Sequence, residues 1–161
     1  MIEKIEKQAF CGIGFHWSGT YQEAANGEIR NLISELLKRK KEIVGKIDES
    51  IIIGVSIHDR PDGFTHFCFF ETNNINHIPN EMVSVQRPAS KYVQFHHPKE
   101  EDIASAYEKV AEYIKNNNIQ VVELESVPKY DLLPIKQEVY NVNEVLSSTP
   151  SYLIEIPVQS F

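Results

Sequence analysis

The alternation of apolar and polar positions in the first part of the chain predicts a strand, a helix and a pair of strands. Residues 8–17 mix aromatic residues, isoleucine and glycine, and we interpret them as a strand. The next segment places apolar residues at the spacing of one helix face, namely Ile29, Leu32, Ile33, Leu36 and Leu37. Thr20 and Glu23 have the spacing of a capping box, so the helix is expected to begin near Tyr21.

Two β-rich segments follow, at residues 50–58 and 64–71. They are separated by Asp-Arg-Pro-Asp-Gly, and a Pro and an Asp-Gly between two such segments predict a β-hairpin. Residues 72–81 are polar and predict a loop. The short apolar run Met-Val-Ser-Val-Gln precedes the second half of the chain.

The second half shows a similar order of elements. Residues 90–97 predict a strand, and a helix is expected from Pro98 to about Asn116. The apolar face of this helix comprises Ile103, Tyr107, Val110 and Ile114. Residues 119–126 and 151–158 predict two more strands, with an extended, proline-interrupted segment at 128–134 between them.

The order strand, helix, strand, strand therefore occurs twice, and the dipeptide Phe-His ends the first strand of each copy. We predict one α+β domain spanning residues 1–161, with half-repeats at about 1–80 and 81–161. In this interpretation two pseudo-symmetric β-α-β-β halves with antiparallel sheets meet at a central cleft. Grooves at such junctions are where small ligands usually bind.

Charge and hydropathy then narrow the functional classes. The net charge of −7 argues against direct nucleic-acid binding, which normally requires a basic surface. No segment is apolar enough to predict a membrane span or a secretory signal, so a cytoplasmic location is expected. The predicted strand near residue 8 leaves no room for a preceding helix-turn-helix, so a role in transcription would require a partner protein. The partner could be another protein or a second copy of this chain in a homodimer.

Two carboxylates are candidates for a cleft. Glu155 lies in the middle of the apolar strand 151–158, where an unpaired buried charge is costly, so it belongs either to a wet face or to a functional cleft. It is our first choice. Glu71 shares a strand face with Phe67 and Phe69, an arrangement that suits a cationic aromatic ligand, although the end of a strand is also a usual place for a solvated carboxylate.

Trp17 is the single tryptophan, and it lies where a strand enters a helix. It either stacks on a planar ligand or closes the edge of the core.

Metal and cofactor sites are not predicted. The chain has six histidines, but His96 and His97 point to opposite faces of their strand. His66 and Cys68 share a face without an evident third ligand. Neither a nucleophile elbow nor a glycine-rich phosphate loop occurs.

Several segments resemble the GyrI-like small-molecule-binding domain, which is the effector-binding half of AraC- and MerR-type multidrug regulators and also occurs alone. They are IPNEMVSVQRPASKYVQFHH, the helix AYEKVAEYI, PKYDLLP and the terminal YLIEIPV, and together they span residues 78–158. The resemblance implies two SHS2-like halves and a cleft in which aromatic residues surround a buried acid. It also implies that flat, lipophilic cations bind in that cleft.

The resemblance also implies particular site residues. The family's acid lies in a Pro-x-aromatic-Glu-x-Tyr segment, which we match to Pro128–Leu133, where Tyr130 and Asp131 stand and Asp replaces the Glu. Tyr92 matches the tyrosine of the family's strand, and Tyr152 is a further aromatic candidate.

These features favour a non-catalytic protein that senses or sequesters a lipophilic small molecule, and the family resemblance implies that this molecule is a cation. Such a protein would be linked to transcription regulation or to drug or toxin resistance. The alternative is a hydrolase of electrophilic toxins, in which Glu155 or Glu71 is the general base and Trp17 or Tyr92 positions the substrate. A third option is a protein-binding inhibitor, because members of the family are known to act on DNA gyrase.

Overall fold

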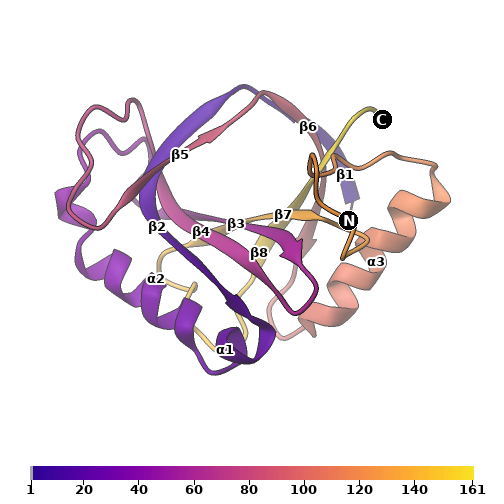
Figure 1. The fold of residues 1–161 in the computed structure, drawn as a ribbon, viewed down its shortest axis with the longest axis horizontal. Coiled ribbons are helices and arrows are strands. Elements are labelled where there is room, and N and C mark those ends of the chain that lie inside the picture. Colours follow the sequence, from indigo (N-terminus) through magenta and orange to yellow (C-terminus); the bar gives the residue numbers. More distant parts are fainter. Residues whose placement is uncertain (1) are drawn as a thin grey trace.

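One eight-stranded antiparallel sheet runs through the molecule, and three helices cover one of its faces (Figure 1). The computed structural model describes residues 2–161. The strands are β1 (Ile2–Lys7), β2 (Phe10–Thr20), β3 (Ile51–Arg60), β4 (Gly63–Thr72), β5 (Val83–Arg87), β6 (Ser90–His97), β7 (Ile135–Asn141) and β8 (Tyr152–Val158). The helices are α1 (Tyr21–Ala25), α2 (Glu28–Lys38) and α3 (Ile103–Asn116), with a 3-10 turn η1 (Lys40–Glu42).

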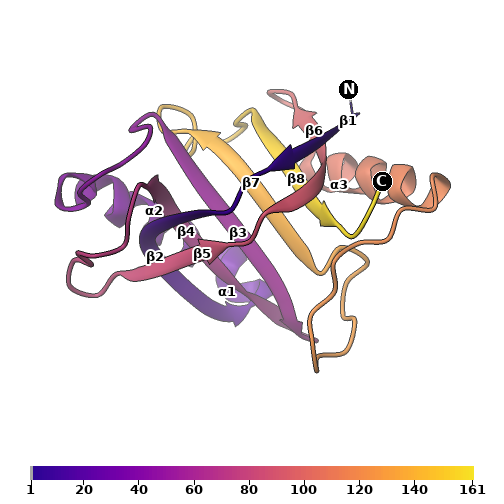
Figure 2. The ribbon, with the colours of Figure 1, turned by 90° about the horizontal axis from the view of Figure 1, so that it is seen from above.

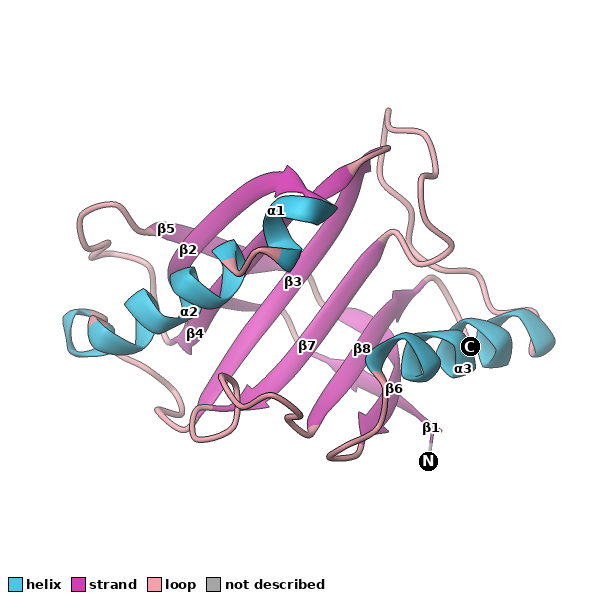
Figure 3. Cartoon of the chain, turned by 90° about the horizontal axis from the view of Figure 1, so that it is seen from below, coloured by secondary structure: helices cyan, strands magenta, loops and turns pink. Residues whose placement is uncertain are grey.

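The strand order is β1-β6-β8-β7-β3-β4-β2-β5, which places β3 and β7 side by side at the centre. Figure 2 views the face opposite the helices, and Figure 3 views the helical face. Helices α1 and α2 cover one side of that face and α3 covers the other, with the central strands between them (Figure 3). The predicted α+β class and antiparallel pairing are confirmed.

Local signals explain the first helical segment. The Thr20 side chain accepts a hydrogen bond from the Glu23 backbone at 3.1 Å, and the Glu23 carboxylate accepts one from the Thr20 backbone at 2.9 Å, so the predicted capping box is present. The helix is broken after α1 because Gly27 adopts a left-handed φ of 95°. The apolar face of α2 then packs on β2 and β4, with Ile33 and Leu36 buried.

The predicted hairpin is also confirmed, as β3 and β4 joined by Pro61 and Asp62. The polar loop and the short strand β5 follow it as expected.

Three elements differ from the predictions. Helix α3 begins at Ile103 rather than at Pro98, because Asp102 caps it by accepting a hydrogen bond from the Ser105 backbone at 3.2 Å. Residues 119–126 do not form a strand, and only Val121 makes an isolated bridge, to Val158. The strand that precedes β8 is instead β7 (Ile135–Asn141), which lies further along the chain than the predicted strand at 119–126.

Two strands, β1 and β7, escaped the sequence prediction because they carry many polar residues. Strand β1 lies at the edge of the sheet, where charged side chains are common because they discourage further strand pairing. Strand β7 lies at the centre, but both of its faces meet polar groups, as described below. Neither position requires the apolar alternation that a strand prediction depends on.

The core has a part on each side of the sheet. Helix α3 packs on β6 and β8 around Val93, Val110 and Ile154, while α2 packs on β2 and β4 around Leu36 and Phe70. On the opposite face, a third cluster forms around Phe69, with apolar residues of β3, β5 and β7.

Replacing the fully buried Leu36 with alanine should destabilise the protein by about 2–5 kcal/mol, because the cavity left under α2 cannot be refilled by rigid sheet neighbours. Leu132→Ala is the matched control, since its side chain is 74% exposed, and a change within about 0.5 kcal/mol is expected. Urea unfolding followed by circular dichroism measures both. Equal losses in the two variants would contradict the packing of α2 described here.

Candidate functional site

Two adjoining cavities lie on the helical face of the sheet, and Tyr140 lines both. The first, of about 160 Å³, lies beside α2 over β3, β4 and β7. The second, of about 380 Å³, lies between β8, the start of α3 and the loop that precedes β8. We call the two cavities together the helix-side groove. It follows the central strands seen between the helices in Figure 3.

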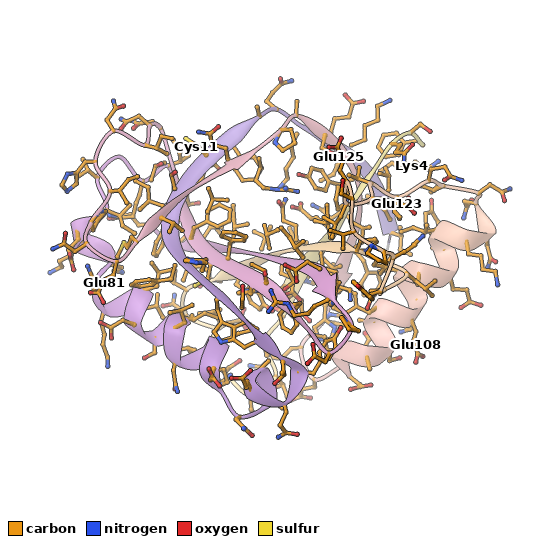
Figure 4. The ribbon with its side chains drawn as sticks, in the orientation of Figure 1. Lys4, Cys11, Glu81, Glu108, Glu123 and Glu125 are labelled. Carbon is orange, nitrogen blue, oxygen red and sulfur yellow. The ribbon has the colours of Figure 1, made fainter. Side chains whose placement is uncertain are left out.

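A carboxylate, Glu138 of β7, lines the first cavity. The hydroxyl of Tyr107, from α3, donates a hydrogen bond to Glu138 Oε2 at 2.7 Å. Burial raises the pKa of Glu138, and the hydrogen bond from Tyr107 opposes part of that rise. Its ionised form is therefore poorly solvated. By contrast, the acids labelled in Figure 4 (Glu81, Glu108, Glu123 and Glu125) are exposed.

Aromatic rings extend the groove from Glu138 into the second cavity. Tyr140 stacks on Tyr152 with a centroid distance of 4.5 Å and an interplanar angle of 22°, and Tyr152 meets His97 at 4.7 Å. Burial, followed by the nearby charge of Glu138, raises the pKa of Tyr140 and of Tyr152, so both remain neutral phenols.

Two polar atoms in this part of the groove are buried without a partner among residues 2–161. They are the hydroxyl of Tyr152 and Nδ1 of His97, and both residues line the second cavity. A buried polar atom without a hydrogen bond costs about 1–3 kcal/mol. The second cavity therefore presents unused hydrogen-bonding capacity beside a stack of aromatic rings.

Two histidines near Glu138, His66 and His58, have lowered pKa values. His66 lines the first cavity, its Nδ1 lies 2.8 Å from Ser56 Oγ, and burial lowers its pKa to about 4. His58 lies further along β3, with Nε2 3.0 Å from Lys136 Nζ. Burial, and then the charge of Lys136, lowers the pKa of His58. Neither imidazole offsets the negative charge of Glu138 at neutral pH.

Lys136 is the cation nearest to Glu138 along β7, and it is already paired. Its ammonium lies 3.2 Å from Asp131 Oδ2 and 5.2 Å from the centroid of the Tyr107 ring. The end of the groove at Lys136 is therefore close to neutral, while the middle carries the carboxylate.

Comparison with known proteins identifies the family. A family model described as GyrI-like small molecule binding domain matches residues 1–141. The chain belongs to the GyrI-like family.

Individual relatives of this GyrI-like domain include regulators. It is 30% identical over 93 residues to the transcriptional regulator BrlR of Pseudomonas aeruginosa, a match that covers 58% of this chain and 33% of BrlR. The chain therefore spans only about a third of the length of that relative.

Two solved structures share the fold. SAV2435 bound to tetraphenylphosphonium superposes with a TM-score of 0.69 at 16% identity, over 99% of this chain and 94% of SAV2435. The C-terminal domain of EcmrR superposes with a TM-score of 0.67 at 14% identity, over 100% of this chain and 98% of that domain.

Several of the predicted site residues lie at the helix-side groove of this GyrI-like domain or next to it. Tyr152 lines the second cavity. Asp131 pairs with Lys136, and it also accepts a hydrogen bond from the Leu133 backbone at 2.8 Å. Trp17 does not line the groove but contacts a residue that does. Its ring centroid lies 5.3 Å from that of Phe64, and Phe64 lines the first cavity. Tyr130 is exposed and lines neither cavity.

Other predicted site residues lie on the opposite face of the sheet. They are Phe67, Phe69, Glu71, Tyr92 and Glu155. The prediction grouped them in one cleft with Trp17 and Tyr152, and the structure corrects this. Alternation along each strand was interpreted correctly, but it does not reveal which face carries the helices.

Glu155 differs from both interpretations considered for it. It is fully buried, and its oxygens accept hydrogen bonds of 2.8 Å from Lys7 Nζ, Gln94 Nε2 and Gln137 Nε2. A buried carboxylate with three charged or polar donors is compensated without a ligand. Glu155 is therefore a structural acid rather than part of a wet face or an open cleft.

Sequence reasoning missed Glu138, Tyr140 and the role of Tyr107. The signal was present, because Glu138-Val139-Tyr140 has the Glu-x-Tyr spacing of the family segment that we sought at residues 128–133. Among residues 2–161, no three His, Cys, Asp or Glu side chains are grouped in a way that could hold a metal ion. Within the same range, the helices are too short or too polar to cross a membrane.

The lowered pKa of His66 predicts a pH dependence of folding. An unfolded histidine takes up a proton below its ordinary pKa of 6.5, whereas folded His66 resists protonation until about 4. The free energy of unfolding should therefore rise between pH 4 and 6.5, with a share from His66 of roughly 3 kcal/mol. Glu138 acts in the opposite sense, because its raised pKa makes stability fall as pH rises above its ordinary value.

Comparing urea midpoints of the wild type and His66→Gln from pH 4 to 7 isolates the histidine, because both proteins retain Glu138. The variant should lose most of the rise. His77→Gln, which removes an exposed histidine, should keep it. An unchanged slope in His66→Gln would show that this imidazole remains accessible to protons.

Proposed function

We propose that this GyrI-like domain binds a lipophilic organic cation in the helix-side groove, with Glu138 as the counter-charge, the rings of Tyr140 and Tyr152 as the aromatic lining and Tyr107 as the hydrogen-bond donor that holds Glu138. The observation that carries the proposal is a poorly solvated carboxylate surrounded by tyrosines. Cations are attracted both by a desolvated carboxylate and by the faces of aromatic rings. The ligand in SAV2435, tetraphenylphosphonium, is a cation of this kind.

The strand order supports the idea of two halves. Exchanging β1–β4 for β5–β8 reproduces the same order read from the other edge, and the exchange brings β3 onto β7. We infer two related β-α-β-β units whose junction is the β3–β7 pair. Glu138 then lies at the junction, where one ligand can contact elements of both units.

The two cavities suit a ligand larger than either. The first holds about 160 Å³, which is small for an organic cation with several rings, whereas the second holds about 380 Å³. We infer that the ligand lies across Tyr140 and occupies both. As a sensor or a sequestering protein, the domain would need only this binding step.

Tetraphenylphosphonium should bind, and Glu138→Gln should weaken its binding about tenfold or more, because the loss of a desolvated charge pair costs at least ~1.4 kcal/mol. Isothermal titration calorimetry measures the affinity. Affinity should also rise with pH until Glu138 is ionised, since the cation binds the carboxylate and not the neutral acid.

Glu71→Gln is the matched control, because Glu71 is a partly buried acid on the other face of the sheet. Its affinity should equal that of the wild type. Equal weakening by both substitutions would indicate attraction by overall negative charge, and the groove would then not be the binding site.

A second candidate function, hydrolysis of an electrophile, is favoured by one observation. The raised pKa of Glu138 would suit a general base that takes a proton from water, and the hydrogen bond from Tyr107 would hold its carboxylate in place. An aryl epoxide tests this function. Diol formation that disappears in Glu138→Gln but persists in Glu71→Gln would establish the hydrolase, whereas the binding proposal expects no turnover by any of the three proteins.

A further inference from the structure

A cavity of about 500 Å³ lies on the face of the sheet opposite the helix-side groove, at the start of β7 and the end of β8. It is bordered by the link from β1 to β2 and by the link from β5 to β6, which run side by side in Figure 2. Pro157 and Ile135, which line it, belong to the face of β8 and β7 opposite Glu138. We call it the edge cavity.

The edge cavity is lined by three cationic side chains, Lys7, Arg87 and Lys91, and by one acid, Glu6. Glu6 lies 3.9 Å from Lys91 at the rim. Lys7 is paired with the buried Glu155 at 2.8 Å. Three cations thus face two carboxylates, which leaves one excess positive charge in a protein whose net charge is −7.

The excess positive charge is that of Arg87. Its Nε donates a hydrogen bond to Gln137 Oε1 at 3.2 Å, and Gln137 in turn donates to Glu155. Within residues 2–161, its two terminal nitrogens form no hydrogen bond and no ion pair. Glu155 already accepts three hydrogen bonds, so Arg87 is held by the neutral amide alone.

We propose that the edge cavity binds a small organic anion, a carboxylate or a phosphate monoester with an apolar body. The fixed Nε contact orients the guanidinium, and its free terminal nitrogens match the two oxygens of such a group. Lys7 and Lys91, each paired with a carboxylate, line the same cavity. Val122, Ile135 and Pro157 provide apolar contacts for the body of the ligand.

The edge cavity would bind anions, whereas the helix-side groove would bind cations, and the two sites lie on opposite faces of the sheet. A partly buried cation without a counter-charge is unfavourable, and a bound anion would relieve that cost. The net charge of the protein cannot account for anion binding at this cavity, because a net charge of −7 repels anions.

Titration of ¹⁵N-labelled protein with phenyl phosphate, benzoate and inorganic phosphate tests the proposal, with benzyl alcohol as the neutral comparison. We expect saturable shifts of the backbone amides of Lys7, Ser90, Lys91 and Val122 for the two organic anions. Inorganic phosphate should bind more weakly, and benzyl alcohol should leave these amides unmoved. Shifts centred on Glu138 or Tyr140, or no saturable shift, would overturn the proposal.

Arg87→Gln should weaken phenyl phosphate binding about tenfold, as expected for loss of a charge-assisted contact worth ~1.4 kcal/mol. Lys38→Gln removes one exposed positive charge at the end of α2 and should change nothing. Equal weakening in the two variants would overturn the proposal. Arg87→Lys keeps the positive charge and replaces Arg87→Gln in the test if that variant does not fold. It should weaken phenyl phosphate binding severalfold, because an ammonium cannot form the bidentate contact of a guanidinium. An unchanged affinity in Arg87→Lys would count against the site.

Discussion

The structure depends on the pairing of β3 with β7. Residues 51–57 and 135–141 run antiparallel in continuous register, and this ladder joins the two parts of the chain into one sheet. Without it, each part would expose a strand edge with unsatisfied backbone groups, which is costly and invites aggregation. The same pairing sets the separation of α2 and α3, because each helix is packed on strands of its own side.

The outer strands strengthen this union. β1, from the first part of the chain, pairs with β6 of the second, and β5 pairs back with β2. Each part therefore supplies an edge strand to the other, and neither can complete its sheet alone. The two links between these strands come together at the edge cavity, so the exchange of strands also creates that space.

Strand β7 separates two kinds of chemistry by the simple alternation of its side chains. Gln137 points to one face and joins Glu155 and Arg87, while Glu138 points to the other and meets Tyr107. On the first face the carboxylate is matched by donors from three strands. On the second it is matched by one phenol, which leaves its charge poorly compensated. Only the second carboxylate is suited to a cationic ligand, although the two acids lie in neighbouring strands of the same sheet.

Short-range signals in the sequence determined the elements whose structure is set by their own residues. The capping box at Thr20 and Glu23, the turn at Pro61, the apolar faces of α2 and α3 and the end of α3 all depend on contacts within a few residues. The family resemblance added the fold. Alternation also identified correctly which side chains share a face within each strand. Tertiary structure alone decided which face carries the helices, and hence that Glu138 lines the groove while Glu155 is enclosed by Lys7 and two glutamines. It also decided that the polar segments β1 and β7 are strands, because an edge and a groove floor are stabilised by backbone pairing to distant strands and do not need an apolar pattern of their own.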